Sequence, residues 1–446
     1  MNFFLYPFYQ KTSMVAHIKT AYGVTMQKLV LLYAGFLFFS LPAYSFSRWD
    51  DLNKPTIFEK DYEYNLNKLS NSGFVSVTPW SDGYYPTEKG GISFRWNQKK
   101  YGQEVELYGY NLLNMDDLSK VNIAELSPSE KWDIFMGDKD WSLTKYERKR
   151  TKVMRTVPGS RVYDAEFKIP SWEGLCHSWA PATLLFETPE AVTVDSANGV
   201  KVPFGASDIK ALLTMFMDTN ESETKYLGSR CNLSKKELKE KLAKGEITAE
   251  EYADGMVELN GPECSDVNAG AFHIVLANQL KGRDEGFVAD ITKDLEVWNQ
   301  PVIGFESEMG TPEEGATPGS AEGTAFQVYV RTKMYFISEI PMSWTSEFNK
   351  ESIEAEIYDY ILELDKDNNI LGGKWLSENH PDFIWKRDRP DFKGYFKPLE
   401  GIYKKSIQHV RRLHFIQAAT SLRNVHRRAT AARNRIAATR TAVGSQ

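Results

Sequence analysis

One cysteine stands where a thiol nucleophile is expected, at the start of a helix. Cys176 follows the turn-forming Gly174, and the run from His177 to Glu187 has an apolar face typical of an amphipathic helix. Pro181 falls in the first turns, where a missing amide proton matters least. A helix N-terminus favours negative charge, so it favours the thiolate that attacks acyl groups. The Cys176 amide would also point at the developing oxyanion, so the pattern predicts covalent acyl transfer.

A thiol nucleophile needs a histidine partner, and His273 is the best candidate among seven histidines. It stands in an apolar run, 272–277, where an imidazole is costly unless it is hydrogen-bonded. This run and residues 286–291 are predicted as two antiparallel strands. Asp290 on the second strand would then orient the imidazole, which predicts a Cys176, His273 and Asp290 triad. The alternative is a hydrogen-bonded core histidine and a structural aspartate.

The other two cysteines are predicted to form a disulfide. The sequence contains three cysteines, so at most one intramolecular bridge forms. Pairing Cys231 with Cys264 leaves Cys176 free and ties down a charged helical insertion. Three reduced cysteines are the alternative.

The N-terminal 45 residues are typical of a secretion signal with an extension. An apolar run, 29–41, follows a lysine, and Ala43 and Ser45 occupy the small-residue positions of a cleavage site. Met26 would give a signal of more usual length. The expected location is therefore secreted or periplasmic, with membrane contact only through the signal sequence. An uncleaved membrane anchor is the alternative.

Composition predicts a folded, acidic body with a basic tail. Hydrophobic residues make up 42% and aromatic residues 13% of the chain, which argues against disorder. The net charge is −6, but residues 408–446 carry eight arginines and no acidic residue. Removing those eight positive charges leaves −14 on the first 407 residues. Nothing in that acidic body suggests a nucleic-acid channel.

An α+β organisation follows from the predicted elements. Helices are expected after the capping box Ser127–Glu130 and over 208–217, and strands over 326–331, 356–364 and 370–376. The predicted segments are a signal region at 1–45, a pro-segment-like N-terminal region at 46–165, a catalytic core at 166–306, a flexible linker or loop at 307–325, a β-rich part at 326–407, and an Arg/Ala-rich, disordered tail at 408–446.

Several sequence blocks resemble one known family. Residues 297–305, VWNQPVIGF, closely resemble the elicitor peptide of the transglutaminase elicitor family, first known from oomycete plant pathogens and with bacterial relatives. Further blocks resemble the same family at 126–131, 170–180, 264–273, 372–375 and 380–383, so the resemblance runs from about residue 120 to about residue 400.

The resemblance implies a papain-like cysteine-transferase core, with the cysteine on a helix and the histidine and acid on antiparallel strands. It implies protein-glutamine γ-glutamyltransferase activity, with Cys176 matching the family nucleophile and His273 the family histidine. Asp290 is the predicted third member, and Asp294 and Asn299 compete for that role.

Three other positions bear on the resemblance. Trp172 is expected to support the oxyanion or to wall off water, with plain core packing as its alternative role. Ile303 and Glu306 stand where the oomycete peptide has basic residues, so recognition by plant immune receptors does not follow from the likeness.

The expected reaction forms a thioester with a substrate glutamine and passes the acyl group to a lysine amine or to water. The expected partners are proteins with accessible Gln and Lys, and the oligomeric state is left open. A papain-like protease or amidase is the alternative enzyme, and a non-catalytic elicitor or binding protein is the alternative of another class.

The chemistry itself needs no cofactor, and calcium is a family expectation only. Residues 365–369 resemble the start of an EF-hand loop, but Ile370 and Leu376 replace the required glycine and glutamate. A polar turn between strands is therefore expected there.

Overall fold

The structure is a computed structural model that describes residues 49–98, 110–230, 235–259, 266–292, 296–346 and 352–407. Outside the described residues lie the predicted signal peptide, the arginine-rich tail, both cysteines of the predicted disulfide, and Asp294.

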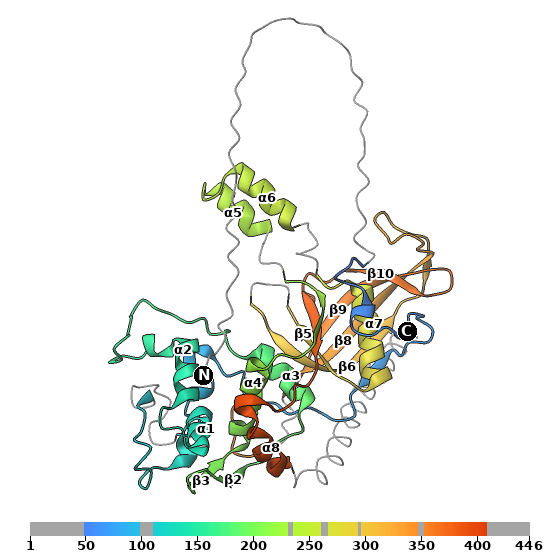
Figure 1. Ribbon diagram of the computed structural model, residues 1–446. Helices are drawn as coiled ribbons and strands as arrows, with labels where there is room; N and C mark the ends of the chain where they lie inside the picture. Colours follow the sequence, from blue (N-terminus) through green and yellow to red (C-terminus); the bar gives the residue numbers. More distant parts are fainter. Residues whose placement is uncertain are drawn as a thin grey trace, which may run out of the picture. The chain divides into compact units, whose positions relative to one another are not determined.

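One antiparallel sheet organises the described residues (Figure 1). Its main path runs β10-β9-β8-β6-β5-β11-β4, with β1 paired to β6 and β7 paired to β8. The strands are β1 (Ser72–Phe74), β4 (Thr224–Gly228), β5 (Phe287–Asp290), β6 (Asn299–Met309), β7 (Glu313–Glu314), β8 (Phe326–Ile337), β9 (Ile353–Leu364), β10 (Ile370–Trp375) and β11 (Phe383–Arg387). A separate hairpin pairs β2 (Val192–Asp195) with β3 (Lys201–Phe204).

Some of the helices contact this sheet, and others contact one another. The helices are α1 (Pro128–Met136), α2 (Ser142–Thr151), α3 (Cys176–Leu185), α4 (Ala206–Thr219), α5 (Lys235–Ala243), α6 (Ala249–Leu259), α7 (Ala269–Leu276), which continues as a π-helix (Ala277–Arg283), and α8 (Leu399–Ile407). Short 3₁₀ turns occur at Pro55–Ile57, Thr87–Lys89, Gly91–Ser93, Ile123–Glu125, Val153–Arg155 and Gly394–Phe396. The helix α3 contacts α4, β5 and β6, whereas α7 contacts β9 and β10.

Local sequence explains where the first helix begins and ends. Ser127 accepts a hydrogen bond from the Glu130 amide while the Glu130 carboxylate accepts from the Ser127 amide, so the predicted capping box is confirmed. Gly137 ends the helix with φ 67°, a left-handed conformation that glycine adopts at little cost. The helix predicted over 208–217 is also confirmed, as α4.

Alternation along the long strands creates the face that α7 covers. On β8, Val328 and Val330 are buried, whereas Tyr329 and Arg331 between them are exposed. The ring of Phe272 in α7 meets the aromatic rings of Tyr358, Tyr360 and Trp375 edge-on or tilted. The strands expected over 326–331, 356–364 and 370–376 are therefore present as β8, β9 and β10.

The strand predicted at 272–277 is wrong, because this run lies in α7. Asn268 caps the helix, and its side-chain oxygen accepts from the amides of Gly270 and Ala271. All eight residues of α7 are buried. The sequence of a helix that is buried on every side does not alternate between apolar and polar residues with the helical period. A short apolar run of this kind is therefore equally compatible with a strand.

The segment predicted as a flexible linker or loop, 307–325, connects β6 to β8 and includes some paired strand residues. The strand β6 continues to Met309, and β7 at Glu313–Glu314 pairs with Gln327 and Phe326 of β8. These polar and charged residues lie at the end of a long hairpin, where backbone pairing supports a strand without an apolar face.

The close approach of α7 to β10 makes Gly270 sensitive to substitution. A Cβ at Gly270 would lie 2.4 Å from the backbone carbonyl carbon of Gly372, and that backbone cannot rotate away. We expect Gly270→Ala to lower the free energy of unfolding by about 3 kcal/mol, measured by urea denaturation.

The matched control for that variant is Gly401→Ala in α8, where a Cβ meets nothing within 4 Å. Removing the backbone freedom of an exposed helical glycine should stabilise the protein by roughly 0.5–1 kcal/mol. Equal stability of the two variants would contradict the described contact between α7 and β10.

Candidate active site

Cys176 is the first residue of α3, and a neighbouring segment fixes the turn before it. The amide of Leu175 donates to the carbonyl of Tyr84 at 2.8 Å. Gly174 is needed here because a Cβ would lie 2.7 Å from that same carbonyl oxygen. The first amides of a helix have no intrahelical acceptor, so they are available to an anion beside Cys176. The helix-start position predicted for this thiol is therefore confirmed.

Two groups from the segment that enters β6 surround the thiol. The Cys176 Sγ lies 3.6 Å from the Val297 carbonyl oxygen, to which it donates, and 3.8 Å from Nδ2 of Asn299. Only 6% of the Cys176 surface is exposed. The thiol is therefore enclosed and has polar neighbours from residues 297–299.

The imidazole beside this thiol belongs to His177, the next residue in the chain. Its Nε2 hydrogen-bonds to Oδ1 of Asp218, in the last turn of α4, at 2.8 Å. Ser178 donates to the same oxygen at 3.3 Å. The His177 side chain remains 51% exposed, so it can receive and release protons. Cysteine, imidazole and carboxylate thus lie together where α3 begins and α4 ends.

The electrostatics of this group favour a protonated imidazole. Burial opposes the charge on His177, but the hydrogen bond to Asp218 and the neighbouring Cys176 sulfur outweigh it and raise its pKa to about 9. Burial likewise opposes the charge on Asp218, yet His177 holds the pKa of that carboxyl below its usual range. An imidazolium between a carboxylate and a thiol is suited to donate a proton to a leaving group.

His273 lies in a different environment, inside α7. It is completely buried, and its Nδ1 hydrogen-bonds to the Tyr360 hydroxyl at 2.7 Å. Burial lowers the pKa of His273 to about 4, so the imidazole is neutral at physiological pH. Its other ring nitrogen, Nε2, is buried and has no hydrogen-bond partner among the described residues.

The register of the sheet shows how the thiol and His273 are separated. Side chains alternate along a strand, so Asn299 and Val302 of β6 point to opposite faces. Val302 pairs with Phe336 of β8, which shares its face with Thr332 four residues earlier. Thr332 hydrogen-bonds to the Tyr360 hydroxyl at 2.6 Å, so Tyr360 lies on the face opposite Asn299. The residues that contact the thiol and His273, Asn299 and Tyr360, therefore lie on opposite faces of the sheet, and the pairing of Cys176 with His273 stays a prediction.

Asp290 and Trp172 occupy supporting positions. Asp290 ends β5 directly opposite Asn299, and its Oδ1 accepts from the backbone amide of Trp298 at 2.9 Å. It therefore orders the segment next to the thiol. Trp172 is partly buried in the turn before α3, and within the described residues its indole donates no hydrogen bond.

Sequence reasoning missed His177 and Asp218. The Cys-His dipeptide was visible, but a histidine next to a nucleophile is not the pattern of papain-like enzymes, whose histidine lies far along the chain. Asp218 directly follows the apolar run of the helix predicted over 208–217, and nothing in the spacing linked it to Cys176.

Comparison with known proteins identifies the family. The transglutaminase elicitor family model matches residues 51–397. The chain belongs to the transglutaminase elicitor family. Among solved structures, the GP42 transglutaminase from Phytophthora sojae is similar with a TM-score of 0.55 and 23% identity, covering 79% of this chain and 95% of that one. No curated protein matches. The fold of mixed helices and antiparallel sheet is thus similar to that of the GP42 transglutaminase.

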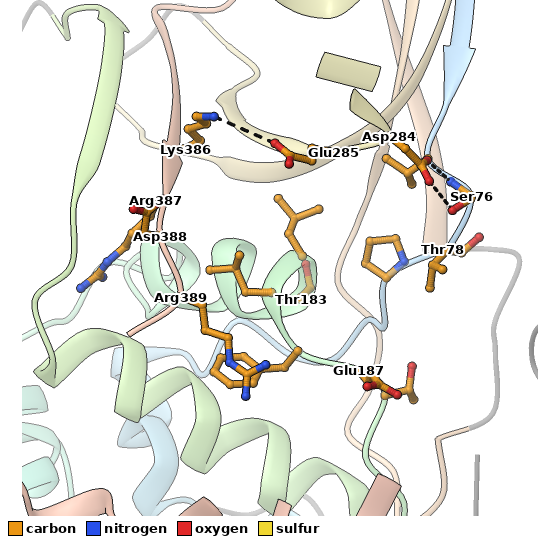
Figure 2. A pocket seen from close by; sticks show the side chains of 18 residues that line it. Ser76, Thr78, Thr183, Glu187, Asp284, Glu285, Lys386, Arg387, Asp388 and Arg389 are labelled. Atoms are coloured by element: carbon orange, nitrogen blue, oxygen red, sulfur yellow. Dashed lines mark hydrogen bonds and ion pairs between the residues drawn. The ribbon is translucent and has the colours of Figure 1, made fainter. Parts of the chain in front are cut away.

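A separate cavity of about 730 Å³ lies at the other end of α3 (Figure 2). Thr183 lines it, seven residues and roughly 10 Å along the helix from Cys176. Charged groups at its wall are paired, with Asp284 accepting from Ser76 and Lys386 lying 4.0 Å from Glu285. No cysteine or histidine lines this cavity, so it is not the site of thiol chemistry in this family member.

The turn predicted at 365–369 is confirmed, and it is closed by its own hydrogen bonds. Asp365 Oδ1 accepts from the amides of Asp367 and Asn369, each at 2.8 Å, and Oδ2 accepts from the Asn369 side chain at 2.9 Å. Among the described residues, no cluster of three or more His, Cys, Asp or Glu side chains could hold a metal ion. Within that same part of the chain, no helix is long and apolar enough to cross a membrane.

Removing the Asp218 carboxylate should lower the pKa of His177. The NMR titration midpoint of the His177 imidazole should lie near 9 in the wild type and fall toward the ordinary value of about 6.5 in Asp218→Asn. Because the folded-state pKa is raised, the stabilisation is fully present below about pH 6.5 and is lost as pH rises through about 9.

The same variant should therefore lose the decline in stability between these two pH values. Asp195→Asn is the matched control, since Asp195 pairs with Lys201 on an exposed hairpin away from any histidine. An unchanged His177 midpoint in Asp218→Asn would contradict the described ion pair.

Proposed function

We propose that this chain is a secreted protein-glutamine γ-glutamyltransferase that acts through Cys176, His177 and Asp218. One observation carries the proposal: a thiol at a helix N-terminus is followed by an imidazole that hydrogen-bonds to the Asp218 carboxylate at 2.8 Å. Family membership supports acyl transfer from glutamine as the reaction. The cysteine on a helix packed against antiparallel strands agrees with a papain-like core.

The first half-reaction releases ammonia. The Cys176 thiolate attacks the γ-carboxamide carbon of a substrate glutamine, forming a C–S bond and placing the carbonyl electron pair on oxygen. When that oxyanion collapses, the C–N bond breaks and His177 protonates the departing nitrogen. Asp218 stabilises the imidazolium until that transfer.

The second half-reaction regenerates the enzyme. A lysine amine attacks the thioester carbon, His177 takes the proton from the attacking nitrogen, and the C–S bond breaks to return the thiolate. Water in place of the amine gives deamidation. Only 6% of Cys176 is exposed, so bulk water has little access and aminolysis is favoured.

A cysteine protease or amidase would use the same three groups, because only the leaving group and acceptor differ. A secreted elicitor or binding protein without activity is the alternative of another class. The signal-like N-terminus supports secretion, where glutamine and lysine side chains of other proteins would be the substrates. In this proposal, protein side chains carry out the reaction without a cofactor. The assay tests separately whether calcium is required.

The test offers the enzyme a glutamine-rich protein and a fluorescent primary amine, with and without chelator. The account predicts ammonia release and covalent incorporation of the amine at glutamine. Peptide cleavage without incorporation would establish the protease, and the absence of any covalent product would favour the binding protein. Loss of incorporation with chelator alone would identify a calcium requirement.

A further inference from the structure

Asn299 presents a side-chain amide to the nucleophile from the opposite wall of the site. It begins β6, only 3% of its surface is exposed, and its Nδ2 lies 3.8 Å from the Cys176 Sγ. A buried amide beside a reacting thiol is either a structural group or a donor to the substrate, and its orientation separates the two.

Trp385 fixes that orientation. Its indole Nε1 donates to Oδ1 of Asn299 at 2.8 Å. An indole N–H can only donate, so the amide atom facing it must be the oxygen, and the NH₂ group must face the thiol. Trp385 is itself 3% exposed and stacks on Tyr226 with a centroid distance of 5.6 Å. The Asn299 amide is therefore held in the orientation in which Oδ1 faces Trp385 and Nδ2 faces Cys176.

This contact argues against the role considered for Asn299 from the sequence, that of orienting a catalytic histidine. Such a residue presents its carbonyl oxygen to an imidazole N–H. Here that oxygen accepts from Trp385, and the imidazole beside the thiol is already oriented by Asp218. The NH₂ group of Asn299 is therefore the part of the side chain that faces the Cys176 sulfur.

We propose that Asn299 Nδ2 is a donor of the oxyanion hole and that Trp385 is its positioning residue, an inference that rests on the proposed function. When the sulfur attacks, the substrate oxygen is one bond from the carbon that sulfur has just joined. A donor within 3.8 Å of the sulfur can reach it with little movement. The backbone amide of Cys176 at the start of α3 supplies the second donor.

The Asn299 N–H stabilises negative charge on the substrate oxygen, and that charge exists only during acylation and deacylation. The C–S bond forms, the carbonyl electron pair moves to oxygen, and the Asn299 N–H stabilises that charge until the C–N bond breaks. Simple alkylation of the thiol by iodoacetamide forms a C–S bond and expels iodide without any oxyanion. The two reactions therefore separate an oxyanion donor from a residue that only maintains the thiol.

The experiment compares both rates in Asn299→Ala and in Asn299→Asp, which has nearly the same shape but no N–H to donate. The rate of acylation by a blocked glutamine-glycine dipeptide should fall about 10²- to 10³-fold in both variants. In Asn299→Ala, which adds no charge beside the sulfur, the rate of Cys176 alkylation by iodoacetamide should stay within a few-fold of wild type, which also reports that the site is folded.

Trp385→Phe removes the N–H donor to Asn299 and keeps an aromatic ring. It should reduce kcat for the dipeptide with a smaller effect on KM. In the Asn299→Ala background it should cause little further loss, because both changes remove one interaction.

Unchanged acylation in both Asn299 variants would overturn the inference, and so would alkylation that falls in proportion to acylation in Asn299→Ala. A wild-type protein that is alkylated at Cys176 but acylated by no glutamine substrate would instead overturn the proposed function. These outcomes are distinct, so failure of one proposal cannot be mistaken for failure of the other.

Discussion

Cys176→Ala should reduce amine incorporation into glutamine substrates to the uncatalysed background. The thiol is the first side chain of α3, and both proposed half-reactions pass through its sulfur. Removing the nucleophile of a hydrolytic triad costs on the order of 10⁶-fold in kcat, so we expect a loss of that size. The measurement is the initial rate of fluorescent amine incorporation.

Cys176→Ser is the second variant, because a hydroxyl keeps the shape of the site but is far less acidic than a thiol. It should be inactive as well. Thr183→Ala is a matched control on the same helix, since the Thr183 hydroxyl only donates back to the carbonyl of Ala180. Residual incorporation in Cys176→Ala at more than a trace of wild type would exclude catalysis by this thiol.

His177→Gln should reduce kcat about 10³-fold, the second largest effect expected. Glutamine can still hydrogen-bond to Asp218, but it carries no proton for the departing ammonia. The thiolate also loses the neighbouring positive charge that stabilises it. Iodoacetamide alkylation at neutral pH should slow in this variant for the same reason.

His273→Asn is the matched control, and it separates the two histidines directly. Asparagine keeps a polar group near the position of Nδ1, which hydrogen-bonds to Tyr360. We expect lower thermal stability and amine incorporation within a few-fold of wild type. A stable His273→Asn protein without activity, together with an active His177→Gln protein, would show that His273 is the catalytic histidine, as predicted from the sequence.

The sequence was most informative about local structure around the nucleophile. A glycine-containing turn followed by a largely apolar run correctly predicted a helix beginning at Cys176, although that helix is buried on most sides and is not amphipathic. The capping box at Ser127 was equally readable, because both partners lie within three residues of each other. These features depend on short-range contacts, so one sequence contains the whole signal.

The partners of the thiol could not be predicted, because they depend on long-range packing. His273 was chosen since an imidazole in an apolar run needs a hydrogen bond, and its Nδ1 has one, with Tyr360. Asp218 is 41 residues from His177, and only the contact between α3 and α4 brings the two together. Whether the run at 272–277 forms a helix or a strand decided which face of the sheet its histidine would occupy.

The central claim is that Cys176 carries the acyl group of glutamine, and its most direct measurement is capture of that thioester. The protein would be mixed with the blocked glutamine-glycine dipeptide without an acceptor amine, quenched in acid and digested. Mass spectrometry should find the Cys176 peptide heavier by the dipeptide less one ammonia, and added primary amine should discharge it before the quench. An unmodified Cys176 peptide during steady turnover, or an acyl group on any other residue, would contradict the account.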